Sequence, residues 1–164
     1  MSEYTYATID SPLGRLELVS DGDALTRLSI EGPDYLLQHG GRPGSPDAII
    51  TQAISELAEY FAGKRTEFTV PVALVGTPFQ QDIWLALLGV PFSQTATYGE
   101  LALAAGHPKA ARAVGGAVGA NPVAIIVPCH RILASDRKLT GYSNGRRVET
   151  KKQLLVIEQA SHRS

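Results

Sequence analysis

The sequence contains few sulfur-containing and aromatic residues. Among its 164 residues there is one cysteine, one methionine and one tryptophan, and aromatic residues make up 7%. The single cysteine, Cys129, excludes an internal disulfide and a zinc site built from several thiolates. The fold must therefore depend on packing, for which a hydrophobic content of 44% is sufficient.

Long hydrophobic runs are also missing. No apolar stretch approaches the roughly 20 residues that a membrane-spanning helix needs. The first residues, MSEYTYATIDSPLG, lack the basic and then apolar order of a secretory signal. We therefore expect a cytoplasmic protein without a membrane partner.

Neither sign of charge dominates, because the formal net charge is −1. The two halves nevertheless differ: residues 1–80 hold 11 acidic and 5 basic residues, and residues 81–164 hold 5 acidic and 10 basic residues. A basic C-terminal half is compatible with a nucleic-acid partner, but an imbalance of this size also arises on ordinary solvated surfaces. Charge alone leaves both interpretations open.

The N-terminal half has the pattern of a small antiparallel sheet followed by a helix. Residues 4–10, 15–20 and 25–30 alternate between apolar and polar positions, and the turn sequences SPLG and DGDA separate them. Residues 31–46 predict a loop, and Asp47 then predicts the start of a helix that ends at Gly63. A short strand near residues 68–70 is expected to complete the sheet. We expect an α/β N-terminal domain over residues 1–72.

The C-terminal half predicts a mostly α-helical domain over residues 77–164. Thr77, Pro78 and Gln80 have the order of a helix cap, a first-turn proline and a capping box, so a helix is expected to about residue 88. Two short alanine-rich helices then flank a Gly-His-Pro break, which is the layout of a helix-turn-helix. Because such helix pairs also occur in proteins that never bind DNA, layout alone does not decide their function.

The final segment, RRVETKKQLLVIEQA, predicts an amphipathic helix. Its spacing places Val148, Leu155 and Ile157 toward the core, with Lys151 and Lys152 on the opposite face. This assignment treats both lysines as solvated residues.

A short apolar run, NPVAIIV, leads into Pro128, Cys129, His130 and Arg131. A neighbouring histidine or arginine lowers the pKa of a thiol, which makes Cys129 a candidate nucleophile. Free cysteine is also among the most buried residue types and often serves as a small apolar filler. Adjacent residues of a strand point to opposite faces, so contact between Cys129 and His130 would require a turn or a bridging water.

The segment PCHRIL, with NPVAIIV before it and LTGYSNG after it, resembles the active-site sequence of the O6-alkylguanine-DNA alkyltransferases. The resemblance continues through GTPFQQDIW, TYGELA and HPKAARAVGGA, and it covers residues 76–158 well and the N-terminal part more loosely. In that family a thiolate removes an alkyl group from O6 of a damaged guanine. The resemblance implies that Cys129 is this nucleophile, that the product is a stable thioether, and that the protein reacts once.

The same resemblance implies the residues that assist the thiol. His130 matches the base that activates the thiol through a water, and Glu158 matches the carboxylate that orients the imidazole. The segment after Tyr142 is about two residues longer than in relatives, so Glu149 is the alternative alignment for Glu158. Arg131 belongs to the motif but is expected to be structural.

Further positions match the substrate and DNA sites of the family. Tyr98 matches the proton donor to the departing guanine, and Asn121 matches the asparagine that holds the turn before the active-site strand. The residues that match the substrate pocket are Tyr142, Ser143 and Ile132. The residues that match the DNA-binding helix are Lys109, Arg112, Ala113 and Gly116.

The resemblance also implies the partner. We expect a monomer that binds double-stranded DNA containing alkylated bases through the minor groove and flips the damaged nucleotide out, with Arg112 filling the gap. The N-terminal half lacks the cysteines that bind zinc in some relatives, so no metal and no cofactor are expected.

Two alternatives remain from the residues themselves. A module that recognises damaged DNA without repairing it would need the same helix pair but not the cysteine. A cysteine hydrolase would use the same cysteine and histidine pair but would turn over repeatedly.

Overall fold

The computed structural model describes residues 4–32, 42–43, 47–142 and 144–160. The chain forms two compact units. One unit comprises Met1–Leu74 together with Pro122–Ala124 and Asn144–Arg146, and the other comprises Val75–Asn121, Ile125–Ser143 and Arg147–Ser164. Two short segments from the C-terminal half therefore belong to the N-terminal unit.

The N-terminal unit is built on an antiparallel meander of β1 (Thr5–Ser11), β2 (Gly14–Ser20) and β3 (Leu25–Ile30). These strands confirm the three that the alternation predicts. A two-residue strand, β4 (Arg42–Pro43), pairs in parallel with β1, so the sheet order is β3-β2-β1-β4. This strand lies within the expected loop 31–46, most of which is outside the described residues.

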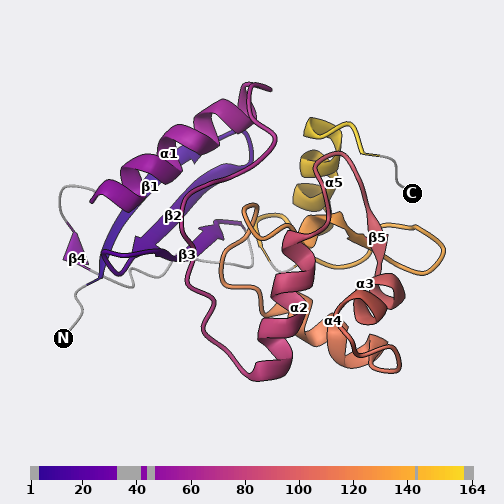
Figure 1. Ribbon diagram of the computed structural model, residues 1–164. Coiled ribbons are helices and arrows are strands. Elements are labelled where there is room, and N and C mark those ends of the chain that lie inside the picture. Colours follow the sequence, from indigo (N-terminus) through magenta and orange to yellow (C-terminus); the bar gives the residue numbers. More distant parts are fainter. Residues whose placement is uncertain (1–3, 33–41, 44–46, 143, 161–164) are drawn as a thin grey trace. The chain divides into compact units, whose positions relative to one another are not determined.

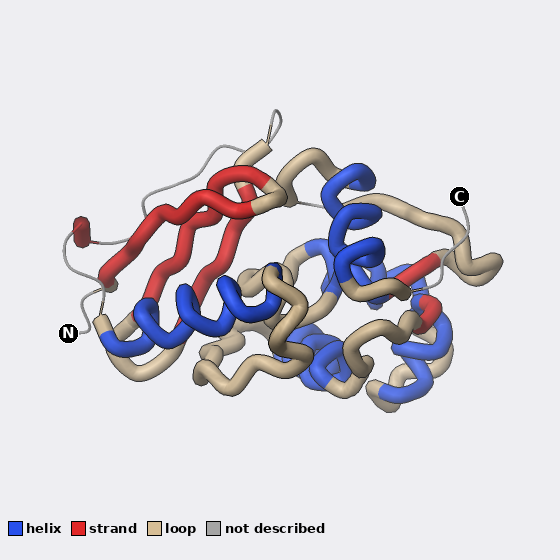
Figure 2. Tube along the Cα trace, turned by 90° about the horizontal axis from the view of Figure 1, so that it is seen from above, coloured by secondary structure: helices blue, strands red, loops and turns tan. Residues whose placement is uncertain are grey.

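Helix α1 (Ala48–Phe61) lies along one face of this sheet, as Figures 1 and 2 show. Its buried apolar residues follow the helical period: Ile50, Ala53, Leu57 and Tyr60. Asp47 caps the helix as predicted, because its side chain accepts a hydrogen bond from the Ile50 amide. The same carboxylate accepts a 2.7 Å hydrogen bond from Ser20 of β2, which fixes the start of the helix to the sheet.

The predicted strand near residues 68–70 is wrong. The amides of Thr69 and Val70 donate instead to the carboxylate of Glu56 on α1, at 2.9 and 3.1 Å. Glu56 is only 4% exposed, so its charge requires these partners. The contact with the sheet is made two residues later, where Val72 bridges Leu25.

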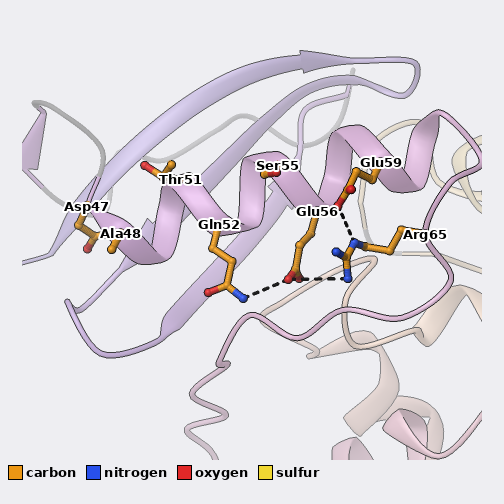
Figure 3. A pocket seen from close by; sticks show the side chains of 8 residues that line it. All are labelled: Asp47, Ala48, Thr51, Gln52, Ser55, Glu56, Glu59 and Arg65. Atoms are coloured by element: carbon orange, nitrogen blue, oxygen red, sulfur yellow. Dashed lines mark hydrogen bonds and ion pairs between the residues drawn. The ribbon is translucent and has the colours of Figure 1, made fainter.

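Figure 3 shows the hollow beside α1 in which this carboxylate lies. Gln52 donates to Glu56, and Arg65 lies against both Glu56 and Glu59. Burial raises the pKa of Glu56, but hydrogen bonds from Thr69, Gln52 and the two backbone amides outweigh it and lower the pKa below its usual value. The hollow is therefore part of the packing of α1 against the following segment.

The other unit is mostly helical, as predicted (Figure 1). Its elements are α2 (Pro78–Leu88), β5 (Ala96–Thr97), α3 (Tyr98–Ala104), α4 (Ala111–Gly119), the 3-10 helix η1 (Cys129–Arg131), β6 (Ile132–Leu133) and α5 (Val148–Ile157). Capping boxes start α2 and α3, and the indole of Trp84 on α2 donates a 2.9 Å hydrogen bond to the Ala117 carbonyl of α4. The helix-turn-helix of α3 and α4 is confirmed. In the described part of the chain, no helix has the length and apolar character to cross a membrane.

The facing predicted for the last helix is confirmed for Leu155 and Lys152 and is wrong for Lys151 and Val148. Lys151, assigned to the solvated face, is 1% exposed, whereas Val148, assigned to the core, is 36% exposed. The buried positions of α5 are Thr150, Lys151, Leu154 and Leu155. The face that packs against η1 thus includes polar residues, and a pattern that treats every lysine as solvated misplaces it.

Candidate active site

The thiol lies at the start of η1, in a segment made of turns rather than the expected strand. Residues 121–128 contain turns and one isolated bridge, and Ile125 has φ 72°, which is rare for a β-branched residue. Cys129 follows and is 6% exposed. Because η1 turns the chain, Cys129 and His130 can both face the interior of this unit, as their burial shows.

Asn121 holds this segment together. Its side-chain amide donates to the Val127 carbonyl at 2.8 Å and to the Sγ atom of Cys129 at 3.2 Å. Tyr142 is also buried, and its side chain lowers the pKa of the same thiol. Asn121 therefore places a neutral donor at the sulfur, where it would stabilise negative charge.

His130, Glu158 and Arg131 form a buried chain of charge-assisted hydrogen bonds. The Nε2 atom of His130 lies 2.7 Å from Oε2 of Glu158, and both side chains are 0% exposed. Arg131 donates to the same carboxylate through Nε at 2.8 Å and Nη2 at 3.0 Å. Its third donor, Nη1, reaches the Val90 carbonyl. Glu158, rather than Glu149, is thus the carboxylate that meets the histidine.

These contacts define the protonation states of the pair. Burial alone would raise the pKa of Glu158, but the hydrogen bond and charge of His130 and those of Arg131 lower it to about 2. Burial lowers the pKa of His130 despite the opposing effect of Glu158, so the imidazole is neutral at pH 7. An anionic carboxylate requires Nε2 to carry the proton, which leaves Nδ1 as the basic atom. Among the described residues Nδ1 is buried without a hydrogen-bond partner.

Lys151 is a further candidate site residue, which the sequence pattern placed on the solvated face. Burial lowers its pKa to about 8, against the effect of the nearby Cys129 thiolate, which raises it. Burial raises the pKa of Cys129, whereas the hydrogen bond from Asn121 and the charge of Lys151 lower it. Lys151 therefore supplies positive charge to a thiol that burial otherwise keeps protonated.

We expect Lys151→Met to move the titration of the Cys129 thiol to higher pH. The variant removes a charge that favours the thiolate and keeps an apolar side chain of similar length. The alkylation rate of the thiol with iodoacetamide, measured against pH, reports this shift. The exposed neighbour provides the matched control, Lys152→Met, which should leave the curve unchanged. Superimposable curves for the parent and Lys151→Met would contradict the assignment.

The residues that match the DNA-binding helix all lie at the surface. Arg112, Ala113 and Gly116 are exposed on α4, and Lys109 is exposed just before it. The opposite side of α4 is buried through Val114, Ala117 and Val118. The exposed face of α4 thus combines Arg112 with small side chains, which permit close approach to another backbone, and Lys109 adds a second cation just before the helix.

The remaining predicted site residues differ in their surroundings. The Tyr98 hydroxyl lies 3.2 Å from Oγ1 of Thr140, and Gly115 of α4 faces the Tyr98 ring. Ile132 is 0% exposed and belongs to β6, so its side chain packs in the core and does not reach the surface. Ser143 is outside the described residues. No group of three or more potential metal ligands occurs in the described ranges.

Comparison with known proteins places the chain in a family. A model described as "6-O-methylguanine DNA methyltransferase, ribonuclease-like domain" matches residues 4–74, and one described as "6-O-methylguanine DNA methyltransferase, DNA binding domain" matches residues 78–160. The chain belongs to this family. The resemblance that the PCHRIL segment carries is confirmed.

Other 6-O-methylguanine DNA methyltransferases align over nearly the whole chain. A methylated-DNA–protein-cysteine methyltransferase from Mycobacterium tuberculosis is 46% identical over 155 residues, which are 94% of this chain and 92% of that protein. A constitutive one from Bacillus subtilis is 39% identical over 96% of this chain and 97% of its own length. The crystal structure of Mycobacterium tuberculosis OGT in complex with DNA has a TM-score of 0.85 at 45% identity, covering 94% of this chain and 92% of that one.

Proposed function

We propose that this methyltransferase repairs O6-alkylguanine in double-stranded DNA by moving the alkyl group irreversibly to Cys129. The observation that supports this most strongly is the buried chain from Arg131 through Glu158 to His130, next in sequence to a thiol held by Asn121. The relatives' names describe transfer from methylated DNA to a protein cysteine. A cysteine hydrolase would need the same pair, but its thioester would be cleaved by water, whereas a thioether is not.

In the proposed reaction His130 Nδ1 takes the thiol proton through a bridging water. The resulting imidazolium is stabilised by Glu158, which stays anionic because its pKa is about 2. The thiolate attacks the alkyl carbon, so the S–C bond forms while the C–O6 bond breaks and its electron pair goes to the guanine ring. Lys151 and Asn121 stabilise the thiolate before the attack.

The guanine anion that leaves must receive a proton. We propose that the Tyr98 hydroxyl donates it and is reprotonated from His130 through solvent, so the net reaction moves only the alkyl group and one proton. The same attack would serve the similar alkoxy carbon of O4-alkylthymine. Every group used comes from one chain, and we therefore propose that the protein acts as a monomer.

The thiol is buried, so a base stacked inside a duplex cannot reach it. We propose that the damaged nucleotide is flipped out, at a cost of a few kcal/mol. The exposed face of α4 would enter the minor groove, where its small residues allow close contact and Arg112 replaces the extruded base. A relative from Mycobacterium tuberculosis has been crystallised in complex with DNA.

The proposed function is tested by intact-mass measurement after incubation with a duplex that contains one O6-methylguanine. The protein should gain about 14 Da, as one methyl group replacing a hydrogen requires, and transfer should stop at one equivalent. A module that only binds damaged DNA would show no mass change. Continued turnover with excess substrate would instead favour the hydrolase alternative.

We expect Arg112→Ala to slow repair of duplex DNA while leaving reaction with the free O6-alkylguanine base near the parent rate. If Arg112 fills the gap that the extruded base leaves in the duplex, its loss removes part of the free energy that offsets extrusion, which costs a few kcal/mol. A free base is not stacked in a duplex, so its reaction needs no extrusion. Single-turnover rates at saturating protein measure this difference.

Lys109→Ala is the matched control for Arg112→Ala, because Lys109 is an exposed cation just before the same helix. This variant should weaken the affinity for DNA and lower the salt slope of DNA binding by about one, the value for one phosphate contact. The rate of alkyl transfer at saturating protein should change little. Equal saturated duplex rates for the parent and Arg112→Ala would refute the role of Arg112 in flipping.

A further inference from the structure

The hydroxyl of Tyr98 lies against the segment that follows β6. Tyr98 is the first residue of α3, and its hydroxyl oxygen is 3.2 Å from Oγ1 of Thr140, so that either oxygen could donate a hydrogen bond to the other. Both side chains are half-buried, which limits the competition of water for this contact. Thr140 therefore meets Tyr98 at the atom that would carry the proton for the departing guanine.

The start of α3 and the neighbouring helix α4 locate the rest of Tyr98. Thr97 caps α3 and accepts a hydrogen bond from the Glu100 amide, and the Glu100 carboxylate accepts one from the Thr97 amide. Gly115 of α4 lies beside the ring, because a Cβ atom at residue 115 would be 4.0 Å from a Tyr98 ring carbon. The capping box thus fixes the backbone, α4 lies along the ring, and Thr140 is placed to orient the hydroxyl.

The segment that carries Thr140 is itself bonded to the start of α3. Strand β5, which leads into Tyr98, pairs in parallel with β6, which leads toward Thr140. Arg137 adds an ion pair, in which its Nη2 atom lies 3.1 and 3.2 Å from the two carboxylate oxygens of Glu100. Arg137 has φ 65°, a left-handed conformation that is uncommon outside glycine. Contacts on both sides of this turn thus keep Thr140 beside Tyr98.

We infer that Thr140 is a positioning residue that donates a hydrogen bond to the Tyr98 oxygen while Tyr98 gives its proton to the guanine. A threonine hydroxyl can donate, so it directs the Tyr98 O–H away from itself and stabilises the negative charge left on the phenolate oxygen. The proton that moves is that of Tyr98, and Thr140 keeps its own. This inference rests on the role of Tyr98 in the proposed function.

The experiment compares two sources of the same methyl group, a duplex with one O6-methylguanine and methyl iodide. Iodide leaves without a proton, whereas the guanine anion needs one, so only the first reaction uses Tyr98 as an acid. Thr140→Val keeps the shape of the side chain and removes the hydroxyl. It should slow single-turnover transfer from the duplex about tenfold, the effect of one hydrogen bond, and leave the methyl iodide rate unchanged. Thr140→Ser keeps the hydroxyl and should recover the parent rate on the duplex.

Mass spectrometry of the peptide that contains Cys129 measures both reactions. The methyl iodide rate also reports whether the thiol and its surroundings remain intact in each variant. A Tyr98→Phe background provides the second comparison, because there Thr140 has no hydroxyl to act through. Thr140→Val should then cause no further loss on the duplex, since the two changes remove one shared interaction. A role in packing alone would slow the double variant by the same factor as the single one.

Three results would overturn the inference: equal losses with both methyl sources, additive losses in the double variant, or a duplex rate that Thr140→Val leaves unchanged or that Thr140→Ser fails to recover. Two other results would overturn the proposed function instead. One is a parent protein that methyl iodide methylates but the duplex does not, and the other is a Tyr98→Phe variant that reacts with the duplex at the parent rate. The two failures are therefore distinguishable.

Discussion

Cys129→Ser is expected to abolish alkyl transfer while leaving affinity for duplex DNA unchanged. A serine hydroxyl is far less acidic than a thiol, and burial already raises the pKa of the group at this position. The donors that help the thiol, Asn121 and Lys151, cannot generate an alkoxide there. The thiol is buried and does not lie on the exposed face of α4, so its loss should not alter binding.

Intact mass and fluorescence anisotropy measure these two properties on the same samples. The parent should gain about 14 Da and the variant nothing, with overlapping binding curves. Because Cys129 is the only cysteine in the chain, a mass gain that persists in the variant would show that another residue type accepts the group.

Glu158→Gln is expected to slow transfer by about 10² to 10⁴, the range for loss of general acid-base assistance. Glutamine can still accept a hydrogen bond from Nε2 of His130, but it cannot stabilise the imidazolium that forms when Nδ1 takes the thiol proton. Glu149→Gln is the matched control, because Glu149 is exposed in the first turn of the same helix. Full activity of Glu158→Gln with loss in Glu149→Gln would contradict the geometry of the buried chain.

The same variant should also be less stable, because Arg131 would keep a buried charge without its carboxylate, which costs about 3–5 kcal/mol. The sign of the pH dependence follows from the lowered pKa. The ionised Glu158 stabilises the fold fully above its usual value of 4.5, and this contribution disappears as the pH falls through about 2. Thermal unfolding of the parent and variant should therefore differ most near neutral pH and converge in acid.

Local signals allowed much of the fold to be predicted. Alternation located β1 to β3, and the caps at Asp47 and Thr77 located the starts of α1 and α2, because these effects act within a few residues of chain. The strand expected near residues 68–70 failed because its amides are used by Glu56, a partner 13 and 14 residues away in sequence.

The residues that surround Cys129 in space were harder to predict than the sequence motif that contains it. The family resemblance located Cys129, His130 and Glu158, whereas no local pattern distinguishes a buried Lys151 from the exposed Lys152 beside it. The anchoring of residues 144–146 to β3 depends on a contact between residues more than 100 positions apart. Such contacts leave no periodic trace in a single sequence.

Lys151 and Glu158 share one helix face, with consequences for which insertions the protein can tolerate. Lys151 lies in α5, and Glu158 is the C-cap of that helix seven positions later; at about 100° per residue this is nearly two full turns. One residue inserted between them would rotate one group about 100° away from its partner, so that either the thiol or the imidazole would lose its charged neighbour. Residues added before α5 keep both groups in phase, and variation in length within this family should therefore collect in the loop before the helix and be absent from its final turns.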